Sequence, residues 1–124
     1  MEVSPGDLID RFSIVKLKME NVDRNFFAKE FQELEEEINS INISKKLKQQ
    51  WVSDFYHINS QIWLLESRIE KLADDWNLEE IGRTALRIRR LNNQRTRMKN
   101  KIAKECGIGF LDKKRFYFRK RLPF

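Results

Sequence analysis

The sequence is poor in the residues that tight turns, disulfides and metal sites require. Its 124 residues include four glycines, two prolines, one cysteine and one histidine. A β-sandwich or barrel needs many turn residues, so this composition argues against both and favours long helices with charged outer faces. With Cys106 alone, no intramolecular disulfide can form, which is typical of a reducing compartment. The cluster of His and Cys ligands that a metal site usually requires is absent as well.

Long apolar runs are also missing. No window approaches the roughly 20 apolar residues that a membrane span requires. The segment 1–7 is acidic and has no apolar core of the signal-peptide type. We therefore expect a cytoplasmic protein with no membrane partner. A chain of this length fits one domain.

Charge is divided unevenly along the chain. Residues 1–77 carry ten Lys/Arg and fifteen Asp/Glu, a net charge of −5, whereas residues 78–124 carry fifteen and four, a net charge of +11. Such a division predicts an anionic partner, pairing between the two halves, or both.

Apolar residues recur in alternating steps of three and four, which predicts four helices. We place them at about 5–22, 26–38, 45–73 and 78–104. Ser4, Ser44 and Asn77 occupy N-cap positions, and the glycines at 107 and 109 stop the last helix. Turns are expected at 23–25 and 39–43. The last helix has one apolar stripe, formed by Ile81, Ala85, Ile88, Leu91, Met98 and Ile102.

The two long helices decide the expected fold. Each would span about 40 Å at 1.5 Å per residue, and the short link between them predicts an antiparallel hairpin. The first two helices would pack along it, giving an all-α antiparallel helical bundle over residues 1–109. Residues 110–124 follow as a basic, aromatic C-terminal extension. A hairpin this long in so small a protein rarely buries both faces, so we expect a homo-oligomer.

The sequence gives little indication of a catalytic site. His57 lies off the main apolar stripe of its helix and has no nucleophile in its sequence context. Cys106 follows a helix C-terminus, where the helix dipole disfavours a thiolate. We expect both to be structural or surface residues, and we expect no enzymatic activity and no cofactor.

Basic residues form a stripe on the last predicted helix. They recur near the helical period, with Arg89 and Arg95 towards the flanks. A stripe of this kind can neutralise the phosphates of a nucleic acid or a nucleotide. A solvated face, or pairing with the acidic run of residues 33–37, explains it equally well. The members of the stripe are Arg83, Arg87, Arg90, Arg97 and Lys101.

The extension 110–124 combines six Lys/Arg with five aromatic residues. Cations beside stackable rings suit the bases and phosphates of a nucleotide or nucleic acid. Aromatic residues that complete the core are the alternative, favoured for Phe116 and Phe118. That alternative is weaker for Arg115, Tyr117 and Arg119, which we keep as candidate ligand-binding residues.

Polar residues stand where apolar ones are expected. Asn92 and Arg95 fall in or beside the seam of the last helix, and Asp7, Asp10 and Arg11 open the first helix. A buried arginine is costly unless a carboxylate or a bound anion satisfies it. The first interpretation is an internal network such as Asp10 with Arg95. The functional one is a pocket in which Arg95 and Asn92 hold an anion, and a network can preorganise such a pocket.

Two segments carry a family resemblance. Residues 5–14 (PGDLIDRFSI) and 81–95 (IGRTALRIRRLNNQR) resemble conserved segments of small all-helical domains of unknown function from bacteria and phages. The resemblance implies that the start of the first helix and the middle of the fourth belong to one site. The family has no established activity, so the resemblance implies no reaction.

The leading hypothesis is a non-enzymatic, oligomeric protein that binds a small anionic, nucleotide-like ligand. Arg95 and Asn92 would form the inner contacts, Arg83, Arg87 and Arg90 a basic rim, and the extension a lid. Sequestration of a host nucleotide signal is a role for such a protein in a phage. The alternatives are a nucleic-acid-binding protein that uses the basic stripe and the extension, and a scaffold or inhibitor that binds another protein.

Overall fold

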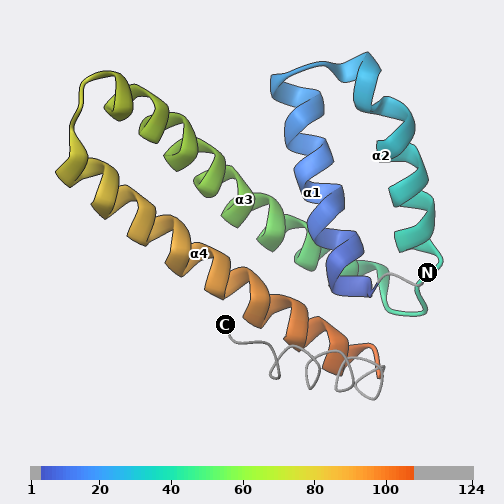
Figure 1. Cartoon of the computed structure of the whole chain (residues 1–124). Helices are drawn as coiled ribbons and strands as arrows, with labels where there is room; N and C mark the ends of the chain where they lie inside the picture. The colour runs from blue at the N-terminus through green and yellow to red at the C-terminus, as the bar shows by residue number, and fades with distance from the viewer. Residues whose placement is uncertain (1–3, 108–124) are drawn as a thin grey trace.

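Four helices form two antiparallel hairpins in the computed structural model, which describes residues 4–107 (Figure 1). The short hairpin consists of α1 (Pro5–Asn21) and α2 (Arg24–Asn39), and the long one of α3 (Lys45–Asp74) and α4 (Leu78–Glu105). This architecture confirms the all-α bundle built on a long hairpin. The extension 110–124 lies outside the described residues. None of the described helices is long and apolar enough to cross a membrane.

Side-chain caps fix where the helices begin. Ser4, Ser44 and Asn77 are the N-caps of α1, α3 and α4, and each side chain accepts a hydrogen bond from a backbone N–H of the first turn. Gly107 has a positive φ of 68° just after α4, which confirms the predicted helix stop. The predicted turn at 23–25 was placed too late. The break falls at 22–23, because Asp23 caps α2 by accepting from Phe26 N at 3.1 Å.

The core lies where α1 meets the other three helices. Its buried residues come from every helix, and α1 packs against α2, α3 and α4. Gly6 allows the start of α1 to approach α4 closely, since a Cβ there would lie 3.0 Å from Lys99 Cα. The fully buried large apolar side chains in this region are Ile9, Phe55 and Ile102.

The long hairpin continues beyond α1 as a two-helix projection, residues 63–91, which we call the arm (Figure 1). Within the arm the apolar seam residues stay only partly buried, and Thr84 is the one buried residue of this range. The sequence pattern placed Ala85 in the apolar stripe of α4, and this was wrong. Ala85 is exposed, whereas the adjacent Thr84 is buried.

Candidate functional site

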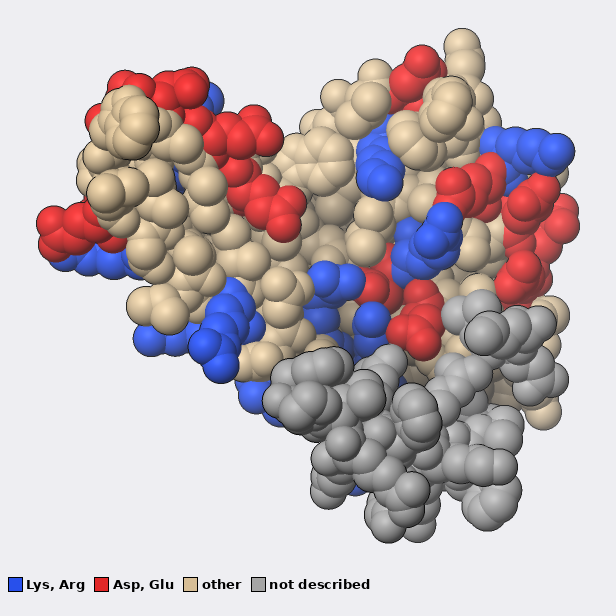
Figure 2. Space-filling model, in the orientation of Figure 1, with Lys and Arg blue, Asp and Glu red and all other residues tan. Residues whose placement is uncertain are grey.

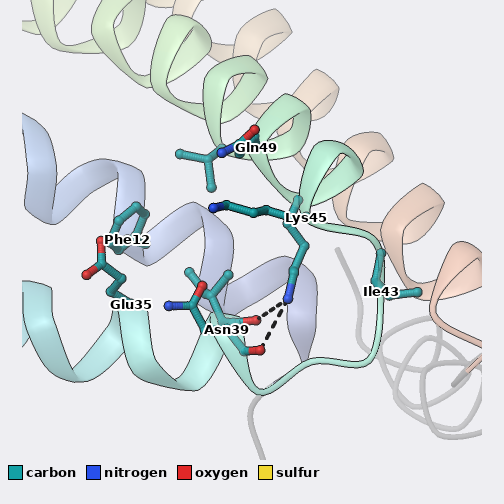
Figure 3. Close-up of a pocket in the computed structure, with 9 residues that line it drawn as sticks. Phe12, Glu35, Asn39, Ile43, Lys45 and Gln49 are labelled. Carbon is teal, nitrogen blue, oxygen red and sulfur yellow. Dashed lines mark hydrogen bonds between the residues drawn. The ribbon is translucent and has the colours of Figure 1, made fainter.

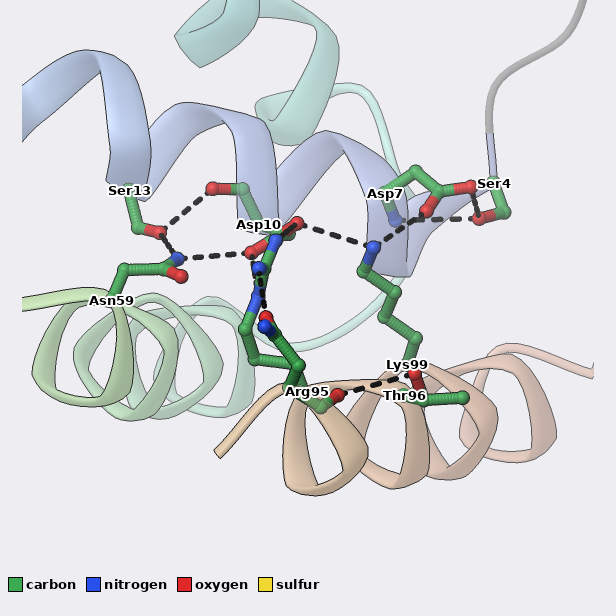
Figure 4. Close-up of polar contacts among 9 residues, drawn as sticks. Ser4, Asp7, Asp10, Ser13, Asn59, Arg95, Thr96 and Lys99 are labelled. Carbon is green, nitrogen blue, oxygen red and sulfur yellow. Dashed lines mark hydrogen bonds and ion pairs between the residues drawn. The ribbon is translucent and has the colours of Figure 1, made fainter. Parts of the chain in front are cut away.

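A polar cluster joins α1, α3 and α4 around the buried carboxylate of Asp10 (Figure 4). Arg95 approaches it with two nitrogens, Nε at 3.2 Å from Oδ1 and Nη2 at 2.5 Å from Oδ2. Lys99 Nζ lies 3.1 Å from Oδ2, and Asn59 Nδ2 donates to Oδ1 at 2.9 Å. Asn59 also donates to Ser13 Oγ at 2.7 Å. We call Asp10, Arg95, Lys99, Asn59 and Ser13 the Asp10 cluster.

The cluster holds Asp10 in its charged form. Burial on its own raises the pKa of Asp10, since a low-dielectric environment disfavours the carboxylate. The hydrogen bonds from Arg95 and Asn59 and the positive charge of Lys99 outweigh burial, so the pKa lies below its ordinary value. Asp10 therefore remains an acceptor for α3 and α4 at neutral pH.

The charges in and beside this cluster balance. Lys99 also pairs with Asp7 at 3.2 Å, so two cations face two carboxylates. Asn92 Oδ1 accepts from Arg95 Nη1 at 2.9 Å, so the third nitrogen of the guanidinium also has a partner. This confirms the predicted internal pairing of Asp10 with Arg95. It also means that the cluster offers a bound anion no excess positive charge, although 21% of the Arg95 side chain and 28% of the Lys99 side chain are exposed.

The other predicted site residues lie apart from the cluster. Arg11 points to α2, where its Nη2 lies 2.7 Å from Glu30 Oε1. Arg83 pairs with Glu79 and Glu80 within the first turns of α4. Arg115, Tyr117 and Arg119 lie outside the described residues, so the structure does not place them.

The remaining cations of the predicted stripe form an exposed surface on α4. Within residues 4–107 none of them is hydrogen-bonded to, or ion-paired with, another side chain. Figure 2 shows basic side chains gathered along α4 and acidic ones at the tip of the arm. Between Ile81 and Lys104 the chain has nine Lys/Arg and no Asp or Glu. We call four exposed residues of this surface the α4 basic stripe: Arg87, Arg90, Arg97 and Lys101.

Sequence reasoning missed three members of the Asp10 cluster, namely Ser13, Asn59 and Lys99. Asn59 directly follows Ile58 of the apolar stripe on α3, and a buried amide there is the kind of polar intrusion that identified Asn92 and Arg95. Lys99 lies one helical turn after Arg95 and so shares its face. The sequence signal for Asn59 and Lys99 was present, but interpreting it required knowing that α1 covers this end of the long hairpin.

A cavity of about 640 Å³ lies elsewhere, between α1, α2 and α3 (Figure 3). Lys48 on its wall is buried, and its Nζ donates to the carbonyl oxygens of Ile38, Asn39 and Ile41 at 2.9–3.3 Å. That ammonium caps the C-terminus of α2 and has no donor left for a ligand. The cavity is lined by Phe12, Glu35, Ile38, Asn39, Ile43, Lys45, Lys48, Gln49 and Val52.

We also looked for groups of metal-binding side chains and for similar known proteins. Among residues 4–107, no group of three or more His, Cys, Asp or Glu side chains is placed to hold a metal ion. No protein-family model, curated protein or solved structure matches this chain.

Proposed function

We propose that this chain is a non-enzymatic binding protein whose ligand is the phosphate backbone of a nucleic acid, held along the α4 basic stripe. The observation that supports this most is the contrast between two sets of arginines. Arg95 is already neutralised by Asp10, whereas the stripe is exposed and has no carboxylate partner within the described residues.

The geometry of the stripe fits a linear polyanion. From Arg87 to Lys101 it extends about 21 Å along one side of a straight helix. Cations at this spacing can each meet a phosphate and release its counterions. Arginine and lysine contacts to phosphates carry no sequence information, so binding should be indifferent to base sequence.

A nucleotide-like small anion is the second candidate. It is favoured by the convergence of Asn92, Arg95 and Lys99, all at least partly exposed, at one point on α4. It is less well supported than nucleic acid, because the neighbouring carboxylates balance the positive charge there.

Fluorescence anisotropy with labelled 20-nucleotide single strands and 20-base-pair duplexes tests the proposal. We expect Kd to rise steeply with salt, by roughly 100-fold between 50 and 200 mM, as about four neutralised phosphates require. A variant with the α4 basic stripe changed to glutamine should bind more than about tenfold more weakly and show a shallower salt dependence. Its substitutions are R87Q, R90Q, R97Q and K101Q.

The matched control removes the same charge from other helices. Its four positions are exposed and make no ion pair within the described residues: Arg24, Lys29, Lys46 and Lys71. The control should bind nearly as tightly as the unaltered protein, and an equal loss in both variants would reduce the effect to net charge. Salt-insensitive 1:1 binding of a nucleoside triphosphate, lost in Asn92→Ala and kept in the stripe variant, would instead establish the second candidate. The control substitutions are R24Q, K29Q, K46Q and K71Q.

A further inference from the structure

The cavity between α1, α2 and α3 has an apolar floor. It exists because α2 and α3 both pack on α1 and make few contacts with each other. Phe12 of α1 and Ile38 of α2 are buried there, and the Phe12 ring stacks on Phe31 with 4.6 Å between the ring centroids. Val52 of α3 and Ile43 of the loop before α3 continue the apolar lining. The floor therefore consists of side chains that the core already holds in place.

Four polar side chains line the rim of this cavity in two facing pairs (Figure 3). Glu35 and Asn39 lie one helical turn apart on α2, and Lys45 and Gln49 lie one turn apart on α3. All four residues are exposed, and within the described residues none of their side chains makes a hydrogen bond or an ion pair. Each wall thus offers one charge and one amide that the fold itself does not use.

The α3 wall is suited to a carboxylate. Lys48, on the same wall as Lys45, is buried, and its ammonium donates to backbone carbonyls, so no carboxylate among the described residues neutralises it. Its donors are used, but its positive charge still acts across the apolar floor, where the dielectric constant is low. A carboxylate at this wall would meet the ammonium of Lys45 and the amide of Gln49, with the charge of Lys48 behind them.

The α2 wall is suited to a donor. Glu35 repels a second carboxylate and accepts hydrogen bonds, and the side-chain oxygen of Asn39 is also an acceptor. An N–H group of a ligand can therefore be held at this wall while its carboxylate stays at the opposite one.

We propose that this cavity binds a small apolar molecule that carries a carboxylate and a neighbouring N–H group, as an N-acyl amino acid does. The apolar body lies on Phe12 and Ile38, the carboxylate at Lys45, and the N–H towards Glu35. The cavity volume of about 640 Å³ is within the range of about 300–1,000 Å³ that is usual for small-molecule sites, which are mostly apolar with a few polar groups. The lining comes from α1, α2, α3 and the loop before α3, so this site is separate from the α4 basic stripe.

Titration of the full chain with N-acetyl-L-phenylalanine, followed by heteronuclear NMR of the backbone amides, tests this site. We expect saturable shifts within residues 35–52, with a Kd on the order of 1 mM for a ligand of this size. N-Acetyl-L-phenylalaninamide lacks the negative charge and should bind at least about fivefold more weakly. Hydrocinnamate keeps the ring and the carboxylate but lacks the N–H, and should bind about threefold more weakly.

Two adjacent lysines provide the matched variants. Lys45→Gln should remove the preference for N-acetyl-L-phenylalanine over its amide, whereas Lys46→Gln, next in the chain and outside the lining, should keep it. Both lysines are exposed, so neither change should disturb the fold. Val52→Phe places a larger side chain in the cavity and should abolish the shifts, with circular dichroism verifying that the helices persist.

The absence of saturable shifts at the lining residues up to about 10 mM of N-acetyl-L-phenylalanine overturns the proposal. Equal binding of the acid and its amide, or of the acid and hydrocinnamate, overturns the ligand class. Equal effects of Lys45→Gln and Lys46→Gln also count against it. Shifts centred on Asn92 and Lys99 would mean that the anion binds at the Asp10 cluster instead, which overturns the site. None of these results bears on nucleic-acid binding, because Lys45 is not part of the α4 basic stripe.

Discussion

Asp10 shows how one side chain can tie three helices together. It stands on α1, accepts from Asn59 of α3, and faces Arg95 and Lys99 of α4. A buried carboxylate is costly to leave without partners, so each of these contacts compensates for its burial. The cluster thus specifies how α1 docks on the long hairpin.

Replacing Asp10 with asparagine keeps the shape of the side chain and removes its charge. Breaking one side of a buried ion pair typically costs 3–5 kcal/mol, and the partial exposure of Arg95 and Lys99 reduces this. We therefore expect the free energy of unfolding to fall by about 2–3 kcal/mol, measured by urea denaturation with circular dichroism.

The control for this substitution is Arg11→Gln, which breaks an exposed ion pair on the same helix. Exposed pairs contribute less than about 1 kcal/mol, so the control should change little. The pKa of Asp10 is lowered in the folded state, so its contribution is present above the unfolded-state pKa. The gap between the unaltered protein and Asp10→Asn should therefore narrow as pH falls through the folded-state pKa. A gap that is constant down to pH 2 would contradict this account.

Part of this cluster could be predicted from the sequence, for a physical reason. Asp10 and Arg95 are long-range partners, yet both interrupt apolar stripes, and a buried charge requires an opposite charge. Lys48 shows the limit of such reasoning. Its partners are backbone carbonyls at the end of α2. No residue type in the sequence indicates that Lys48 will lie beside these carbonyls in the fold.

At the scale of the helices, caps and periodicity predicted the four elements, but not which helix covers which. The alternating steps of three and four place Ile81 and Ile102 on one stripe of α4. Only Ile102 is buried, because α1 reaches one end of the hairpin and not the other. The helical period of the apolar residues therefore predicted the stripe, whereas the burial of each residue along it depends on tertiary contacts.

The approach of α1 to α4 depends on Gly6. An added Cβ would lie 3.0–3.2 Å from three Lys99 atoms, two of them backbone, so the helices would have to separate by a few tenths of an ångström. That shift also loosens the Asp10 cluster. We expect Gly6→Ala to lower the free energy of unfolding by about 1–2 kcal/mol, despite the better helix propensity of alanine.

Gly82 provides the matched comparison within α4. A Cβ at that position meets nothing within 4 Å, so alanine should raise stability by up to about 1 kcal/mol through helix propensity alone. Opposite signs for the two substitutions, measured in the same denaturant series, are the expected result. Stabilisation by Gly6→Ala would show that the α1–α4 approach is not tight in solution.

For the molecule as a whole, the structure separates a well-packed base from a sparsely packed arm. Buried apolar residues of α3 end at Ile62, and those of α4 begin again at Ile102. Local stability follows the density of buried contacts, so the two parts of the same helices should open with different free energies.

Amide hydrogen exchange read by mass spectrometry on α3 and α4 tests this difference. At low protein concentration, peptides from the arm, residues 63–91, should exchange at least tenfold faster than peptides from 48–62 and 95–103. The helical hydrogen bonds are alike in both parts, so the difference measures missing tertiary cover. Uniform exchange along α3 and α4 would mean that the arm is stable as an isolated two-helix hairpin, which its half-buried seam argues against.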